Sequence, residues 1–421
     1  MDQKNVFALA LGLAGTPWKV VEIGFDPELK RLNITLDFPL GSRFAHLETG
    51  QPSPVYDCAP RSWRHLNFFQ FECYVHAPIP RVDGGPGGGV KQVDVPWARP
   101  RSGFTLLMES LLLVLAQSGM TAAEVAQVIG EYPQRVWSVL LHHVAQAHER
   151  MDWGSVRVIS VDEVCRARGQ NYLTIVSEPK HEGHPSRILL AVEGRDSKTL
   201  RKFADHLRRR GLNPEQIRTI CSDMSPAYIK GISEEFSGAL LVFDFFHVVQ
   251  LVTDALDEVR RRERRDFPQE LKGVRWAMLK GEDKLSDEER ATRRRVCAGR
   301  LQTGKAFNHL DALRQIMKEP DPVVAERDLK WWCRWVARSR IPEMQKVART
   351  IRTHWDGVVA YLQTRVTNGA AEALNGIIQT VKRKSRGFRT VEYFTTMIYL
   401  VASHLHFDLP NPLPATHTNS Y

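Results

Sequence analysis

The sequence has 421 residues, of which 43% are hydrophobic and 25% are charged, the composition of a globular protein with about two to four domains. This excludes a disordered chain, a collagen-like fibre and a small disulfide scaffold. Lys and Arg number 58 against 48 Asp and Glu, and this basic excess favours a polyanionic partner, most commonly nucleic acid. No apolar run reaches the roughly 20 residues of a membrane-spanning helix, and no signal-peptide pattern is present, so we expect a cytoplasmic protein.

Residues 1–100 are expected to form a small, irregular β domain, because they are rich in Pro, Gly and aromatic residues. Hydrophobic alternation predicts short strands at Trp18–Ile23 and Leu32–Phe38. The glycine-rich run 84–89 predicts a loop. It is not a phosphate-binding loop, because the Gly-Lys-Ser/Thr sequence that such a loop requires does not follow it.

Residues 101–150 carry the pattern of a helix-turn-helix. Thr121 and Glu124 form a capping box for a helix 122–129 that ends at Gly130, and Pro133 opens a second helix over 134–144. Two short helices joined by a tight turn are typical of DNA-binding proteins, although an ordinary helical pair has the same pattern. In the DNA-binding interpretation, the second helix offers Gln134, Arg135 and Ser138 to a DNA groove.

The hydrophobic pattern of residues 151–250 predicts a mixed sheet with helices on its faces. Strands are expected at 156–161, 172–176, 188–192, 217–221 and 240–245, with helices at 197–210 and 225–236. The resulting order β-β-β-α-β-α-β is that of the ribonuclease-H-like fold, an α/β class.

Two carboxylates follow strands that we expect to be neighbours in this sheet. Asp162 comes at the end of the first strand and Asp223 directly after the fourth. Carboxylates that converge in this way repel one another unless a cation lies between them, and Mg²⁺ binds one or two protein carboxylates together with waters and phosphate oxygens. The alternative is that Asp223 is a turn residue or caps the following helix.

The remaining chain is predicted to be helical. This part comprises residues 251–365 and residues 366–407. Here Glu372 is the best candidate for a third carboxylate, and Asn375 lies one turn further along the same helix face. Five cations without an acid between them then suit a phosphate backbone: Lys382, Arg383, Lys384, Arg386 and Arg389. Residues 408–421 are expected to be a disordered tail.

Several short motifs in this order resemble the ISL-three family of bacterial insertion-sequence transposases. They are Trp-Arg-His-Leu (63–66), Val-Pro-Trp-Ala-Arg-Pro (95–100), Ser-Val-Asp-Glu (160–163), Ser-Asp-Met-Ser-Pro-Ala-Tyr (222–228), Val-Phe-Asp-Phe-Phe-His-Val (242–248), Leu-Lys-Gly-Val-Arg-Trp (271–276), Ser-Arg-Ile-Pro-Glu-Met (339–344) and Thr-Asn-Gly-x-x-Glu-x-x-Asn (367–375). The resemblance extends from about residue 5 to residue 407.

The resemblance implies a DDE recombinase whose catalytic, metal-binding set is Asp162, Asp223 and Glu372. The resemblance also implies that residues 251–365 are a helical insertion between the second and third acids and that residues 366–407 end the catalytic core. Asp223 and Glu372 are 372 − 223 = 149 residues apart, which agrees with such an insertion. The cofactor would be Mg²⁺ or Mn²⁺, with two ions expected, and the partner would be double-stranded DNA, both transposon ends and target, bound by a homo-oligomer at the bacterial nucleoid.

Asp244 and His247 end the fifth predicted strand, which we expect to lie next to the first in the sheet. They match a similar Asp-x-x-His of the family, and Asn375 ends the last motif. These three residues could orient the metal-binding carboxylates or the DNA. Alternatively, Asp244 and His247 form a buried pair that fixes the start of a helix. A DNA-binding regulator without catalysis, derived from a transposase, and a metal-dependent nuclease of the same fold remain alternatives.

The N-terminal region departs from the family in its zinc ligands. Members carry two Cys-x-x-Cys pairs that form a zinc ribbon, whereas the corresponding places here are His46-x-x-Thr49 and Gly84-x-x-Gly87. Tetrahedral zinc needs four ligands, so we expect residues 1–100 to be a DNA-binding domain that resembles a degenerate zinc ribbon and binds no zinc. The regulator interpretation gains support from this loss.

Overall fold

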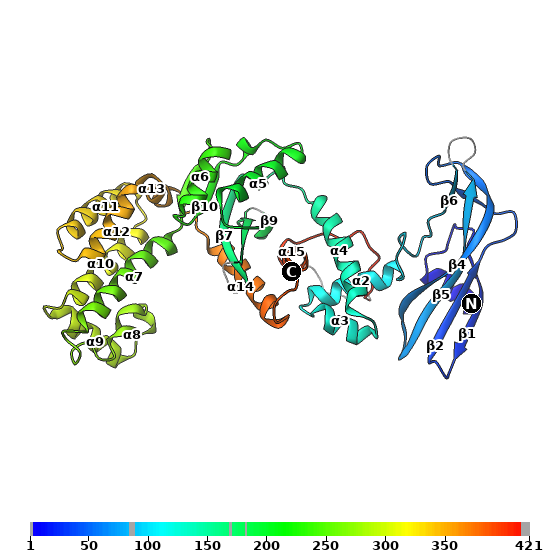
Figure 1. Ribbon diagram of the computed structural model, residues 1–421, viewed down its shortest axis with the longest axis horizontal. Helices are drawn as coiled ribbons and strands as arrows, with labels where there is room; N and C mark the ends of the chain where they lie inside the picture. Colours follow the sequence, from blue (N-terminus) through cyan, green and yellow to red (C-terminus); the bar gives the residue numbers. More distant parts are fainter. Residues whose placement is uncertain (1–2, 84–88, 168–170, 182, 414–421) are drawn as a thin grey trace. The chain divides into compact units, whose positions relative to one another are not determined.

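The computed structural model describes residues 3–83, 89–167, 171–181 and 183–413, and the chain divides into two units (Figure 1). The first unit comprises Met1–Arg150 and the chain from Leu405 onward, and the second comprises Met151–His404. The C-terminal segment, which we expected to be partly core and partly a disordered tail, is therefore assigned to the N-terminal unit as far as residue 413. Its last residues, 414–421, lie outside the described part. None of the described helices is long and apolar enough to cross a membrane.

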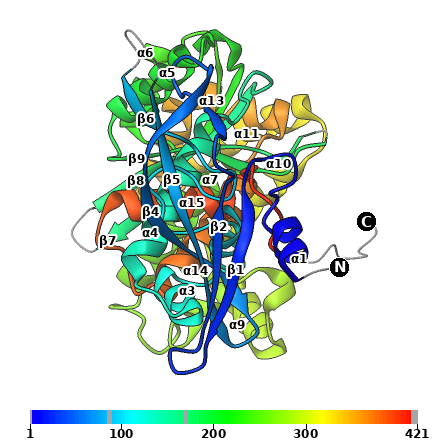
Figure 2. The same ribbon diagram turned by 90° about the vertical axis from the view of Figure 1, so that its right-hand side faces the viewer.

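The first unit contains a regular six-stranded sheet, which corrects the expectation of an irregular region. Its elements are α1 (Gln3–Ala10), β1 (Lys19–Asp26), β2 (Arg31–Asp37), β3 (Arg43–Ala45), β4 (Pro52–Phe68), β5 (Phe71–Asp83) and β6 (Val90–Gln92). The strand order is β1-β2-β5-β4-β3, with β6 paired to β5. Figure 2 shows β1, β2, β5 and β4 of this sheet side by side. The inward side chains of β2 and β5, among them Ile34, Leu36, Val75 and Ile79, are fully buried. This apolar core holds the sheet together.

His46 is the one residue at the four family zinc-ligand positions that could still bind zinc. It is buried, its Nε2–H donates to the Gly89 carbonyl (3.1 Å), and its Nδ1 accepts from the backbone N–H groups of Glu48 and Thr49 (3.3 and 3.4 Å). Both ring nitrogens are thus used within the protein. Gly84 and Gly87 lie outside the described residues. The absence of zinc stays a prediction.

Three helices complete the first unit: α2 (Leu106–Gln117), α3 (Ala122–Ile129) and α4 (Pro133–Glu149). The capping box of Thr121 and Glu124 is confirmed, and Gly130 ends α3 in the left-handed region at φ 73°. Helix α4 begins at Pro133 as expected but continues to Glu149, beyond the predicted end. The α3–turn–α4 arrangement is therefore the one that the sequence predicts.

The second unit is built on a five-stranded mixed sheet. Its elements are β7 (Val158–Ala167), β8 (Asn171–Glu178), β9 (Arg187–Glu193), α5 (Ser197–Arg209), the 3₁₀ turn η1 (Pro214–Gln216), β10 (Thr219–Ser222), α6 (Pro226–Glu235) and β11 (Leu240–Phe243). The strand order is β11-β10-β7-β8-β9; β7, β8 and β9 are antiparallel, and β10 runs parallel to both β7 and β11. The predicted element order and the mixed sheet are confirmed.

A helical region follows β11. It consists of α7 (Phe245–Glu263), α8 (Val274–Leu279), η2 (Glu282–Lys284), α9 (Asp287–Ala298), α10 (Gln302–Lys318), α11 (Pro322–Ala337), α12 (Pro342–Thr353) and α13 (Trp355–Thr364), after which α14 (Gly369–Lys384) and α15 (Val391–Ala402) return to the sheet. Helices α7 and α10 to α13 share one apolar core with Val242 and Phe243 of β11. The helical region is therefore packed beside the β11 side of the sheet (Figure 1).

The remaining helices cover the two faces of the sheet. Val161 of β7 packs in one cluster with Leu200 and Phe203 of α5, whereas Val164 packs with Leu374 and Ile378 of α14. Because side chains alternate along a strand, even-numbered residues of this stretch of β7 face α14, and odd-numbered residues face α5. Asp162 is consequently on the α14 face.

The core of the helical region contains a buried histidine, which makes its stability depend on pH. Burial lowers the pKa of His309 to about 4, and its ring packs edge-to-face with that of Trp335, with the two ring centroids 4.4 Å apart. Since the folded pKa lies below the ordinary value of 6.5, the neutral ring stabilises the fold above about pH 6.5, and this stability is lost as the pH falls toward 4. Between about pH 7.5 and pH 4.5, the free energy of unfolding should fall by roughly 2–3 kcal/mol less in His309→Phe than in the wild type, as measured by urea unfolding. Equal pH dependence in both proteins would contradict this.

Candidate active site and DNA-binding residues

Asp162 lies within β7 rather than at the end of a strand. We expected the strand to stop before it, but β7 continues to Ala167 because β8 pairs with it along this stretch, with Asp162 opposite Ile175. The pairing of β10 with β7 is shorter and has its last pair at Cys221 and Ser160. Asp162 is therefore placed just beyond the point where β10 stops pairing with β7.

Asp223 comes directly after β10, the strand next to β7. Its Oδ1 accepts a hydrogen bond from the backbone N–H of Ser225 at 3.0 Å, immediately before α6. This is the turn role that the sequence left open. Its Oδ2 has no hydrogen bond to any described residue, so one oxygen is not used by the turn.

Helix α14 brings the third predicted carboxylate to the same part of the sheet. Glu372 lies in its first turn, and Asn375 follows three residues later. The amide Nδ2 of Asn375 donates to Asp162 Oδ2 at 2.7 Å, while the backbone N–H of Glu163 donates to Asp162 Oδ1 at 2.7 Å. Asp162 and Asn375 are 213 residues apart, and their bond attaches the face of α14 that carries Glu372 to β7.

Asp244 and His247 lie where β11 leads into α7. We expected the fifth strand to lie next to the first, and this was wrong: β11 pairs with β10, which separates it from β7. Asp244 is fully buried; its Oδ2 accepts from Nδ1 of His247 at 3.1 Å, and its Oδ1 accepts from the backbone N–H of Asn368 at 3.0 Å. Asp244 thus joins the start of α7 to the residue that precedes α14.

These acids influence one another electrostatically. Burial raises the pKa of Asp162, and the charges of Asp223 and Asp244 raise it further. The protein packed around Glu372 raises the pKa of its carboxyl, as do the charges of Asp244 and Asp162. The pKa of His247 is raised as well, because its hydrogen bond to Asp244 and the negative charges of the neighbouring acids favour the protonated ring. The four carboxylates therefore form one cluster of negative charge.

The donor set of this cluster suits a hard divalent cation. Among the described residues, no three His, Cys, Asp or Glu side chains converge closely enough to enclose a metal by themselves. Mg²⁺, however, requires only one or two protein carboxylates when waters and substrate phosphates supply its other ligands. Asn375 adds an oxygen here, because its Oδ1 is buried and has no partner in the described structure. The residues thus fit a cation shared with substrate.

Asn368 is a residue of the site whose role the sequence did not reveal. It precedes α14, is fully buried, and has a side-chain amide whose oxygen and nitrogen both lack partners among the described residues. Its backbone N–H binds Asp244 and its carbonyl accepts from the N–H of Glu372 at 2.8 Å. An Asn before a helix suggests a side-chain cap, but here the backbone makes the contacts that position Glu372.

The three predicted DNA-binding residues of the helix-turn-helix have different environments in the structure. Gln134 and Ser138 are exposed on α4. Arg135 is engaged within the protein instead: its guanidinium forms an ion pair with Glu131 at 2.6 Å, donates to the Gly103 carbonyl at 3.3 Å and lies 4.2 Å from the centre of the Phe104 ring. Arg135 therefore fixes the start of α4.

The basic cluster 382–389 is only partly helical. Helix α14 ends at Lys384, and Arg386 has a left-handed φ of 52° just before Gly387, so Lys382, Arg386 and Arg389 do not share a helix face. Lys382 donates to the Cys165 carbonyl at 2.5 Å. Arg383, Lys384, Arg386 and Arg389 are exposed. The cluster thus forms the end of a helix and a turn.

Comparison with known proteins identifies the family. A profile described as a transposase matches residues 159–398, and one described as the helix-turn-helix domain of transposase family ISL3 matches residues 93–144. The transposase for insertion sequence element IS1557 of Mycobacterium tuberculosis is 27% identical over 397 residues, which are 86% of each chain. The transposase for IS1001 of Bordetella parapertussis is 23% identical over 351 residues, 81% of this chain and 84% of the relative. Since the transposase profile covers more than half of the sequence, from β7 to α15, this chain belongs to the ISL3 family of insertion-sequence transposases.

Proposed function

We propose that this transposase cuts and joins DNA as a DDE recombinase, with Asp162, Asp223 and Glu372 as its catalytic carboxylates. The observation that carries the proposal is the bond between Asn375 of α14 and Asp162 of β7, because it attaches the helix of Glu372 to the strand of Asp162. The strand that leads to Asp223 is the parallel neighbour of β7. Three acids far apart in the sequence therefore belong to elements that meet.

The sheet supports a ribonuclease-H-like core for this site. Its five strands lie in the order β9-β8-β7-β10-β11. The first three strands of the chain, β7, β8 and β9, pair antiparallel, and β10 and β11 run parallel to β7. We further propose that residues 251–365 are an insertion into this core, since the chain leaves the sheet after β11 and returns as α14. The insertion accounts for the long separation of Asp223 and Glu372.

The chemistry would consist of phosphoryl transfers at DNA phosphorus. Water attacks the phosphorus and the P–O3′ bond breaks, which frees a 3′-hydroxyl; this hydroxyl then attacks a target phosphorus and displaces another 3′ oxygen. Two Mg²⁺ or Mn²⁺ ions held by Asp162, Asp223 and Glu372 would activate the attacking oxygen and stabilise the leaving one. Asn375 and the Glu163 N–H fix the orientation of Asp162, and Asp244 positions the start of α14.

The test is cleavage of the element's own DNA. The full chain is incubated with duplexes that carry the terminal sequences flanking its gene, with Mg²⁺ or with a chelator, and the cuts are mapped. We expect Mg²⁺-dependent cuts at the element's ends that leave 3′-hydroxyl groups. Specific binding without any cut would support the alternative of a catalytically silent regulator instead.

We propose that Gln134 and Ser138 contact DNA bases, while Arg135 acts through the fold. Gln134→Ala should reduce discrimination between the terminal repeat and random DNA by about tenfold, because a good side-chain–base pair contributes about 1–3 kcal/mol. Arg135→Ala should instead lower thermal stability, because it leaves the buried carboxylate of Glu131 without its partner. Competition binding and thermal melting of both variants measure the two effects. The assignment is contradicted if Arg135→Ala loses specificity at unchanged stability.

Arg386, in the turn after α14, is proposed to contact the DNA backbone rather than base edges. Arg386→Ala should weaken binding to specific and random DNA alike and reduce the slope of log K against log salt by about one. Lys202→Ala, which removes an exposed cation from α5, is the matched control. An unchanged salt slope, or a loss confined to the terminal repeat, would show the backbone assignment to be incorrect.

A further inference from the structure

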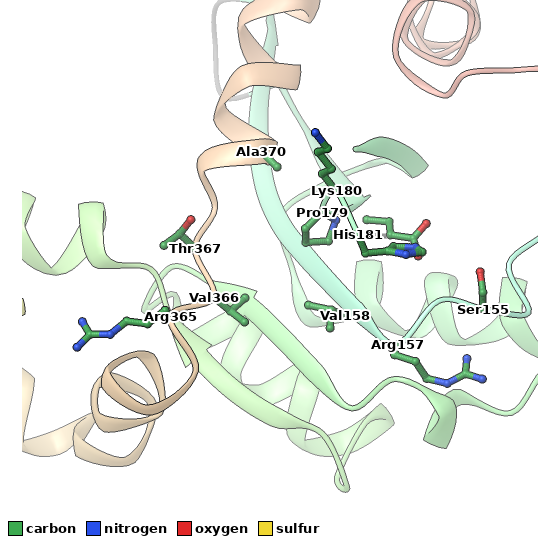
Figure 3. Close-up of a pocket in the computed structure, with 11 residues that line it drawn as sticks. Ser155, Arg157, Val158, Pro179, Lys180, His181, Arg365, Val366, Thr367 and Ala370 are labelled. Atoms are coloured by element: carbon green, nitrogen blue, oxygen red, sulfur yellow. The ribbon is translucent and has the colours of Figure 1, made fainter. Parts of the chain in front are cut away.

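The second unit contains a cavity of about 500 Å³ apart from the carboxylate cluster (Figure 3). It is formed by the start of β7, the segment that follows β8 and the connection that leads into α14. The size is within the range of about 300–1,000 Å³ that is typical of small-molecule sites. None of its lining residues is one of the predicted catalytic carboxylates.

The centre of this cavity is apolar. Val158, Pro179 and Val366 lie around its middle in Figure 3, and Ala370 of α14 closes it near Lys180. None of the described lining residues is Phe, Tyr or Trp. Such a surface suits a flat apolar group that enters from outside, because the side chains of Val158, Pro179 and Val366 carry no polar group that would have to be satisfied.

Cationic groups lie at the two ends of the cavity. Lys180 is exposed and has no hydrogen-bond or ion-pair partner among the described residues, and Arg157 lies on the other side of Val158 (Figure 3). Toward the described residues, Arg157 uses only its Nη1, which donates to the carbonyls of Gly154 and Val156 at 2.8 and 2.9 Å. Its remaining N–H donors stay available for an anion.

The other charged lining residues do not offset these cations. Glu178 is buried and already accepts from Arg187 at 2.7 Å and from His181 at 3.1 Å. Arg365 donates to the carbonyls of Met317 and Glu319, and its side chain points away from the cavity (Figure 3). The cavity thus combines an apolar centre with a cationic rim.

The position along β7 relates the cavity to the proposed cutting site. Val158 precedes Asp162 by four residues, so the two side chains face the same side of the strand, roughly 13 Å apart. This distance equals about four steps of roughly 3.4 Å along the axis of a stacked duplex, and fewer nucleotides of an unstacked strand. Ala370 precedes Glu372 by two residues on α14.

We propose that this cavity binds one unpaired nucleotide of the DNA substrate a few steps from the cleaved bond. Its base lies between Val158, Pro179 and Val366, and its phosphate contacts Lys180. A paired base is stacked inside the duplex and does not expose its faces, so the apolar centre selects a nucleotide that has left the stack. The proposal rests on the DNA-cutting function proposed above.

The test is a scan with 2-aminopurine, a fluorescent base that brightens when it is unstacked. It is placed in turn at each of about ten positions around the mapped cut, and each duplex is bound by the full-length protein. We expect a several-fold rise in fluorescence at one or two adjacent positions, since no described aromatic side chain lines the cavity to quench it. Ala370→Phe, which fills the cavity, should abolish the rise, whereas Ala370→Ser should retain it.

Lys180→Glu provides a second, independent variant. It should weaken binding of the responsive duplex about tenfold, and the control Lys198→Glu on α5, also exposed, should weaken it much less. If the wild-type protein cuts the DNA but no position brightens, or if Ala370→Phe brightens like the wild type, the cavity proposal is wrong and the cutting function stands. If Ala370→Phe loses the rise but Lys180→Glu equals its control, the cavity takes a base without a phosphate contact, which overturns the proposed ligand. A wild-type protein that neither binds nor cuts overturns both proposals.

Discussion

Asp162→Asn is expected to abolish DNA cleavage while DNA binding persists. Asn at this position keeps the size of the side chain and one oxygen for the bond from Asn375, but it removes the charge that binds the cation. We expect the cleavage rate to fall by at least about 1,000-fold, which corresponds to about 4 kcal/mol of transition-state stabilisation. Single-turnover cleavage of the terminal duplex, with binding measured in parallel in Ca²⁺, gives both quantities.

Glu163→Gln is the matched control for this prediction. Glu163 is the next residue of β7 but lies on the opposite face of the sheet, toward α5 and α6. The same change of charge, one residue away and on the other face of the sheet, should leave the cleavage rate within a few-fold of wild type. Normal cleavage by Asp162→Asn, or equal losses in both variants, would contradict the assignment of Asp162.

Asp244→Ala is expected to slow cleavage about 10- to 100-fold, the usual effect of removing a residue that orients metal ligands. The buried carboxylate accepts from the N–H of Asn368 and from His247, so its loss releases the connection that positions Glu372. The variant should also lose about 1–3 kcal/mol of stability, because a buried N–H is left without an acceptor. Cleavage rates at saturating DNA and urea unfolding measure the two effects.

Two further variants separate positioning from general destabilisation. Asp244→Asn keeps an acceptor for the Asn368 N–H and should recover most of the cleavage rate. Asp257→Ala removes a mostly buried carboxylate that pairs with Arg260 at 2.7 Å in α7, away from the site. It should destabilise the protein without slowing cleavage at saturating DNA. If Asp257→Ala slows cleavage as much as Asp244→Ala, the effect of Asp244 is only structural.

The strands of the second unit could be predicted because their patterns are local. Each is a short run of β-branched and apolar residues bounded by Gly, Pro or polar residues, and the element order then restricts the topology. The continuation of β7 past Asp162 could not be predicted in this way. It depends on the pairing with β8, a tertiary contact that outweighs the polar pair Asp162-Glu163.

The long strands of the first unit were missed because proline usually excludes a central strand. Pro78 and Pro80 lie in β5 all the same, paired with Pro60 and Cys58 of β4. On the other side of β5, the pairing with β2 ends at His76 and the pairing with β6 begins at Arg81. The two prolines therefore occupy the interval where β5 has a strand neighbour on one side only, and the N–H that they lack is not needed there.

The residues of the candidate site could be named from the sequence, but their connections could not. Motif spacing indicated Asp162, Asp223, Glu372 and Asn375, yet no local pattern shows that Asn375 binds Asp162 across 213 residues. The engagement of Arg135 with Glu131 and Phe104 was equally hidden, since a basic residue early in a second helix has the same appearance whether it contacts DNA or the protein. Both relations depend on how distant elements pack.

The most direct test of the central claim maps the bound cation on the polypeptide itself. Fe²⁺ replaces Mg²⁺ at oxygen-rich sites, and with ascorbate and peroxide it generates radicals that cut the chain next to the ion. Mass spectrometry of the full-length protein should show three groups of cuts, near Asp162, Asp223 and Glu372, which excess Mg²⁺ suppresses and which Asp162→Asn greatly weakens. Cuts at other places, or cuts near these residues that Asp162→Asn leaves unchanged, would contradict the proposal that these three carboxylates hold the metal ions that cut DNA.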